Sequence, residues 1–199
     1  MINTAAPRHK IFVSYHHAGD QAYKESFIRA FGGAFDDFSV RTREIPDNLT
    51  VDEVARRIRD EHIRDATVTV VLIGNGTWGR KHVDWEIYSS LRETRSNLRN
   101  GLLGILLPSY RLPQTCPLPR QRAEPARTEY CPNNIPPRLW DNVPPNRSFG
   151  TVRPWPADAT ELRAWIHEAF RRRDQEPPPN LSRDRFGRNR NEDDSHWTS

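Results

Sequence analysis

The sequence has no apolar run that approaches the roughly 20 residues needed to cross a bilayer. Its first ten residues, MINTAAPRHK, also lack the apolar stretch of a signal peptide. Hydrophobic residues make up 35 % of the 199 residues, which is below the usual share of a globular chain. We therefore expect a soluble protein with a cytoplasmic location and no membrane partner.

Cysteine and lysine are scarce as well. Cys116 and Cys131 are too few for a disulfide framework and lack the CxxC spacing of a zinc site, so we expect free thiols in a reducing compartment. Only three of the 30 basic residues are lysines, and acidic residues are interspersed among the arginines. No basic stripe marks a nucleic-acid interface, and the seven histidines show no metal-ligand spacing. The sequence thus predicts neither a nucleic-acid partner nor a metal site.

What the sequence does contain is an alternation of apolar segments and amphipathic helices. Three short apolar runs rich in β-branched residues are typical of strands buried on both faces, and two weaker segments also read as strands. The five strands are predicted over 10–15, 37–40, 66–74, 101–108 and 149–155. The helices are predicted over 21–31, 51–63, 79–91 and 158–173. This order indicates an α/β fold with a doubly wound parallel sheet flanked by helices.

Two of the predicted helices carry start signals. Thr50 and Glu53 match a capping box at the start of the second helix. Asp20 directly precedes the first helix, where it fits an N-cap, a ligand contact or both.

Two segments depart from the alternating pattern. Ten of the 17 prolines fall between Pro108 and Pro145, which predicts a long ordered loop or insertion over 108–148. After Arg173 the chain is polar and contains three consecutive prolines at 177–179, so we expect disorder from about residue 176. The resulting organisation is an N-terminal extension over 1–8, one domain over 9–173 and a disordered polar tail over 174–199.

Glu86 is an unusual residue within the helix predicted over 79–91. Val83, Ile87 and Leu91 form its core-facing stripe, and Glu86 lies at the edge of that stripe. A carboxylate there either points into solvent or works at the mouth of a pocket. Its neighbours Trp85 and Tyr88 are expected to pack against the domain.

Two stretches together resemble the TIR-like domains of bacterial antiphage defence, most of all the TIR-domain subunit of Thoeris systems. They are KIFVSYHHAGD (10–20) and ATVTVVLIGNGTWGRKHVDWEI (66–87); NIPPRLWDN (134–142) and RPWP (153–156) also fit. The likeness covers roughly 9–173 and implies a flavodoxin-like TIR fold in a bacterial protein. It further implies cleavage of NAD at the nicotinamide N-glycosidic bond, with NAD as substrate and no cofactor. The product would be a cyclic or conjugated ADP-ribose signal that activates a partner effector protein.

The resemblance assigns the catalytic role to Glu86, on the helix after the third strand. Breaking a glycosidic C–N bond develops positive charge on the ribose, which one nearby carboxylate can stabilise. Nicotinamide leaves as a neutral molecule, so a general acid is not obligatory. We expect the first strand, the loop after it and the turn before the helix to bind NAD through Phe12, Ser14, Tyr15, His16, Asp20 and Trp78.

Other functions fit parts of the pattern. In an inactive TIR-type scaffold or interaction module, Glu86 would be incidental. A receiver-like phosphoacceptor domain needs an aspartate at the end of the third strand, where this sequence reads VLIG. The resemblance also suggests that a neighbouring subunit completes some TIR sites through the loop after the second strand. That loop, RTREIPDNL (41–49), either supports a homo-oligomer on activation or is a solvated connector.

Overall fold

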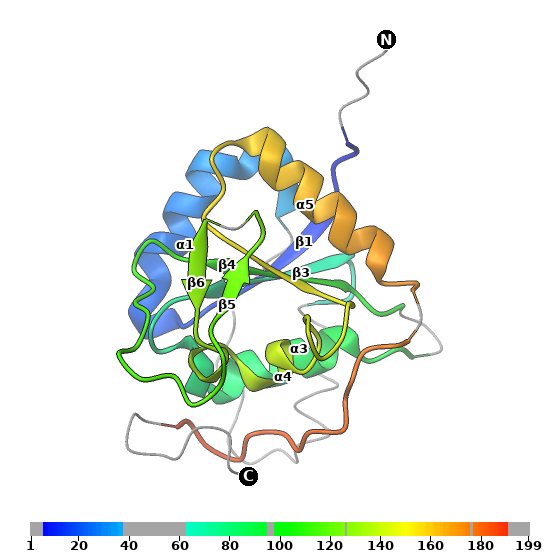
Figure 1. The fold of residues 1–199 in the computed structure, drawn as a ribbon. Helices are drawn as coiled ribbons and strands as arrows, with labels where there is room; N and C mark the ends of the chain where they lie inside the picture. Colours follow the sequence, from blue (N-terminus) through cyan, green and yellow to red (C-terminus); the bar gives the residue numbers. More distant parts are fainter. Residues whose placement is uncertain (1–5, 38–62, 95–97, 126, 176, 191–199) are drawn as a thin grey trace.

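The computed structural model describes residues 6–37, 63–94, 98–125, 127–175 and 177–190 (Figure 1). Five parallel strands form its main sheet in the order β2-β1-β3-β4-β7. The strands are β1 (Lys10–Ser14), β2 (Asp36–Asp37), β3 (Val68–Ile73), β4 (Gly101–Leu106) and β7 (Thr151–Arg153). The order changes direction between β1 and β3, as in flavodoxin-like sheets. The predicted α/β class and doubly wound parallel sheet are confirmed.

Helices cover both faces of the sheet. Figure 1 shows α1 (His17–Phe31) and α5 (Ala159–Arg172) on one face, and α3 (Lys81–Leu91) with α4 (Pro137–Trp140) on the other. Alternate residues of β3 therefore join two separate cores: Val70 and Leu72 pack toward α1 and α5, whereas Val71 packs toward α3. This double burial explains the continuous apolar sequence of the central strands. Within the described ranges, no helix is long and apolar enough to cross a membrane.

Helix α1 starts four residues before the predicted position. Its N-cap is His16, which makes no side-chain capping bond, and the backbone N–H of Asp20 already donates to the carbonyl of His16 at 2.7 Å. Asp20 lies inside the first turn and is buried, so its prediction as the N-cap is wrong. The capping box at Thr50, its helix, the loop 41–49 and most of the predicted strand 37–40 lie outside the described residues.

The proline-rich segment is ordered, as predicted, but it contains more regular structure than a loop. It forms an antiparallel hairpin from β5 (Gln121–Ala123) and β6 (Thr128–Tyr130), then the 3-10 helix η4 (Pro132–Asn134) and α4. The hairpin lies beside β7, where the N–H of Glu124 donates to the carbonyl of Val152.

Cys116 and Cys131 form a disulfide within this segment, so the prediction of two free thiols is wrong. The chain folds back through the hairpin and brings these residues together across a sequence separation of 15. The spacing of the two cysteines in the sequence does not predict that the chain folds back and brings them together.

Residues 177–190 have no regular secondary structure, yet they lie along the outer side of α3 (orange to red in Figure 1). Phe186 is only 4 % exposed. The indole N–H of Trp85 donates to the carbonyl of Phe186 at 2.8 Å, and the N–H of Arg190 donates to the carbonyl of Gly79 at 2.8 Å. The predicted disorder is therefore wrong for 177–190, because the domain binds the backbone of this segment and buries Phe186, the one aromatic residue between 177 and 190. Residues 191–199 lie outside the described ranges.

Candidate functional site

The candidate site begins with Glu86, in the second turn of α3. Glu86 is 3 % exposed, and its carboxyl accepts a 2.6 Å hydrogen bond from the hydroxyl of Ser14, the last residue of β1. Of the two orientations that the sequence left open, the solvent-facing one is thus excluded. Burial raises the pKa of Glu86 to about 8, and the hydrogen bond from Ser14 opposes this rise. The carboxyl group is therefore mostly protonated at neutral pH.

His82 lies one helical turn before Glu86 and contacts the same end of β1. Its Nε2 is 3.2 Å from the carbonyl oxygen of Tyr15, and its ring meets that of His17 edge-on at 5.0 Å. Burial, aided by the proximity of His17, lowers the pKa of His82 to about 4. The imidazole is therefore neutral, and the contact with Tyr15 requires the hydrogen on Nε2. Sequence reasoning missed His82, although its i, i+4 spacing from Glu86 was a usable signal.

Two more of the predicted residues, Tyr15 and Phe12, differ in their surroundings. Tyr15 stacks on His17 at 4.4 Å between ring centroids and donates to Oε1 of Gln21 at 2.5 Å. Burial raises the pKa of Tyr15, and the nearby Glu86 raises it further. Phe12 is on the α3 side of the sheet, like Ser14, but it packs into a small apolar cluster with Trp85. The structure thus places Tyr15 beside Glu86 and gives Phe12 a core position.

Asp20 and His16 connect the loop after β1 to the turn after β3. Asp20 accepts a 3.2 Å hydrogen bond from the hydroxyl of Thr77, which itself accepts from the N–H of Gly74. A Cβ at Gly74 would collide with the carboxyl of Asp20, so this close approach requires glycine. The imidazole of His16 packs less tightly against Gly76, where a Cβ would lie 3.1 Å from Nδ1. These contacts hold the loop after β1 against the turn after β3.

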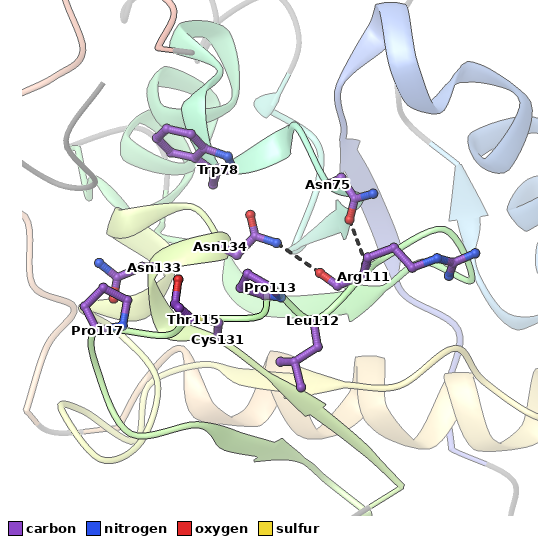
Figure 2. Close-up of a pocket in the computed structure, with 10 residues that line it drawn as sticks. All are labelled: Asn75, Trp78, Arg111, Leu112, Pro113, Thr115, Pro117, Cys131, Asn133 and Asn134. Carbon is purple, nitrogen blue, oxygen red and sulfur yellow. Dashed lines mark hydrogen bonds between the residues drawn. The ribbon is translucent and has the colours of Figure 1, made fainter. Parts of the chain in front are cut away.

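Trp78 lies apart from the other predicted site residues. It lines a pocket of about 370 Å³ at the carboxyl ends of β3 and β4, here called the Trp78 pocket (Figure 2). Neither Glu86 nor Ser14 lines this pocket. The lining residues are Asn75, Trp78, Arg111, Leu112, Pro113, Thr115, Pro117, Cys131, Asn133 and Asn134. Most of them come from the proline-rich segment, and sequence reasoning found no signal for them.

The outer side of α3 is held by a buried ion pair. Asp84 and Arg138 are 1 % and 0 % exposed, with Nε–Oδ1 and Nη2–Oδ2 distances of 2.9 and 3.2 Å. Arg138 also donates to the backbone carbonyls of Arg183 and Asp184. Tyr88 packs beneath the guanidinium groups of Arg138 and Arg185, so Tyr88, like Trp85, has the expected packing role. Together these contacts fix α3, and with it the position of Glu86.

A family model described as Thoeris protein ThsB, TIR-like domain, matches residues 12–111 of the chain. The matched range runs from β1 to the first residues after β4 and includes Ser14, Asp20 and Glu86. The hairpin, β7, α5 and the tail lie beyond it. The comparison with curated proteins finds no match.

Proposed function

The chain belongs to the Thoeris ThsB TIR-like domain family of antiphage defence, and from this premise we propose that it cleaves NAD at the nicotinamide N-glycosidic bond. One observation carries the proposal: Glu86 is buried beside Ser14, next to the point where the strand order reverses between β1 and β3. Ligands of open α/β sheets bind at the carboxyl ends of the strands at such a point.

Cleavage of the N-glycosidic bond requires mainly one carboxylate close to the ribose. As the C–N bond breaks, nicotinamide leaves with the bonding electron pair and the ribose becomes positively charged. Ionised Glu86 stabilises this charge in a site shielded from water, where such an interaction is strong. The cationic nicotinamide riboside itself favours ionisation of the carboxyl group when it binds. Ser14 supports the same state, because its hydrogen bond stabilises the carboxylate.

The second half of the reaction determines the product. Attack of water on the ribosyl carbon gives ADP-ribose, whereas attack by a nucleophile of the same molecule gives a cyclic product. Attack by a third molecule gives a conjugate. We propose a cyclic or conjugated signal, read by a partner effector protein in the bacterial cytoplasm, with NAD as substrate and no cofactor.

Incubation of the purified protein with NAD, followed by mass spectrometry of the products, tests this function. Wild type should release nicotinamide, and Glu86→Gln should lose that activity because it keeps the side-chain size but removes the charge. Glu93→Gln is the matched control: it lies just beyond α3, its side chain is 53 % exposed, and its activity should equal that of wild type. Undiminished turnover in Glu86→Gln would refute the catalytic role. Absence of cleavage in all three proteins would support the inactive interaction module instead.

A further inference from the structure

We propose that the Trp78 pocket is a separate binding subsite that takes an uncharged purine nucleoside, the adenosine half of NAD. The choice of ligand rests on the proposed function. The existence of the subsite rests on the size, polarity and position of the pocket.

The size of the pocket suits a nucleoside. Its volume of about 370 Å³ is near the lower end of the roughly 300–1,000 Å³ typical of ligand sites. A whole dinucleotide needs more room than this. The pocket therefore fits one half of NAD, with the other half lying outside it.

The polarity of the pocket favours an uncharged ring over a phosphate. Arg111 is the only ionisable side chain among the lining residues. Its guanidinium donates to the backbone carbonyls of Pro108 and Tyr110, and Figure 2 shows it pointing away from Trp78 and Asn133. The remaining polar side-chain groups of the lining are amides, a hydroxyl and the indole N–H of Trp78, which recognise neutral donors and acceptors.

Asn133 supplies the most specific group of the pocket. The residue is 8 % exposed, and its Oδ1 has no hydrogen-bond partner within the described residues. A buried acceptor without a partner is uncommon in folded proteins and is a sign of a missing donor. The exocyclic amine of adenine is such a donor. Trp78 is itself buried, at 4 % exposed, and contributes an aromatic wall to the lining.

The pocket lies at the same edge of the sheet as the Glu86 region. Ser14 ends β1, Asn75 follows β3, and Arg111 follows β4, all at the same edge of the sheet. Neighbouring strands are roughly 4.8 Å apart, and the two strands that lead to the pocket, β3 and β4, are one and two places from β1 in the sheet. Asn75 lines the pocket, and the adjacent Gly76 packs against His16 of the Glu86 region. With the reacting riboside at Glu86, the other nucleoside extends over β3 and β4.

Titration calorimetry with adenosine, and separately with nicotinamide riboside, tests the subsite without any turnover. Adenosine should bind wild type, and Asn133→Leu should weaken its binding about fivefold or more, as expected for one lost hydrogen bond. Gln114→Leu changes an exposed residue of the same segment outside the lining and should bind as wild type does. Nicotinamide riboside should be insensitive to Asn133→Leu.

Two further measurements separate binding from folding. Asn133→Leu should melt no lower than wild type, because it removes an acceptor that is unpaired in the free protein. Thr115→Tyr changes an exposed lining residue and should block adenosine by filling the pocket.

The possible outcomes test the adenosine subsite independently of the proposed NAD cleavage. Failure of wild type to bind adenosine, or equal binding by wild type, Asn133→Leu and Thr115→Tyr, would overturn the subsite even if NAD is cleaved. Adenosine binding that both variants weaken, in a protein that leaves NAD intact, would support the subsite and refute the proposed reaction.

Discussion

The hydroxyl of Ser14 donates a 2.6 Å hydrogen bond to the carboxyl of Glu86 and so joins the end of β1 to the second turn of α3. This bond favours the ionised carboxylate, while burial of the side chain favours the neutral acid. Burial dominates, and the pKa of Glu86 is about 8. The balance between the two effects makes both the stability and the proposed activity of the protein dependent on pH.

We expect the free energy of unfolding to fall as the pH rises from about 6.5 to 8. In this range Glu86 holds its proton in the native state, but an unfolded glutamate, with its ordinary pKa of 4.5, does not. Stability therefore declines by at most about 1.4 kcal/mol per pH unit. The buried histidines have the opposite effect at lower pH: His82 stays neutral in the native state down to about pH 4, so its contribution is lost as the pH falls below 6.5.

Urea unfolding at several pH values measures this dependence, with Glu86→Gln as the variant that lacks the titrating group. The decline between pH 6.5 and 8 should disappear in the variant. An equal decline in both proteins would assign it to another group.

The rate of NAD cleavage should rise with pH and level off above about 8. The pH dependence of kcat/KM reports the free enzyme, whose Glu86 must ionise before it can stabilise the ribosyl cation. Ser14→Ala removes the bond that favours ionisation and should move the midpoint of the profile to higher pH. A profile that is flat between pH 6 and 9, or unmoved by Ser14→Ala, would contradict this assignment.

Loss of Arg138 should destabilise the protein strongly. Arg138→Gln leaves Asp84 buried without its cation, which typically costs about 3–5 kcal/mol. The double variant Asp84→Asn/Arg138→Gln should cost less than the sum of the two single changes, as measured in a double-mutant cycle by urea unfolding. Arg127→Gln breaks the exposed pair with Glu161 and should cost less than about 1 kcal/mol. Similar losses at both pairs would show that the burial of Asp84 has no special weight.

Removal of the ring at Phe186 should also lower stability. Phe186→Ala opens space beside α3 and should cost roughly 3 kcal/mol, the lower end of the range for buried phenylalanines. Leu98→Ala is the control, because Leu98 is 58 % exposed and its truncation opens no cavity. Thermal unfolding compares the variants, and a melting temperature of Phe186→Ala equal to that of wild type would mean that the tail adds nothing to the fold.

The parts of the fold that sequence patterns predicted are those whose pattern is local. β3 and β4 are buried on both faces, so their sequences are almost continuously apolar. The alternation of strands and helices along the chain predicted the parallel, doubly wound sheet. Glu86 was identified as a candidate through its place at the edge of a core-facing stripe and through the family resemblance. In the structure the carboxyl of Glu86 accepts a hydrogen bond from Ser14, which lies 72 positions earlier in the sequence.

The features that sequence reasoning missed depend on contacts between distant segments. Asn133 and Trp78 line one pocket although 55 positions separate them, and no periodicity relates them. The tail reads as disordered because its composition is polar, yet the side chains of Trp85 and Arg138 bind its backbone. The ring of Phe186 is buried, but one phenylalanine among many polar residues changes the composition of the segment too little to predict this packing.

The packing of residues 183–190 on α3 also bears on how the protein is made. Trp85 precedes its partner Phe186 by 101 residues, so at about 5–20 residues per second a ribosome needs roughly 5–20 s to deliver that partner. Arg138 is synthesised 54 residues after Asp84, so the same side of the helix stays uncovered until then. During translation the sheet can begin to assemble while the helix that carries Glu86 still lacks its outer support. A nascent chain therefore acquires a fixed Glu86 only after residues 183–190 have been synthesised.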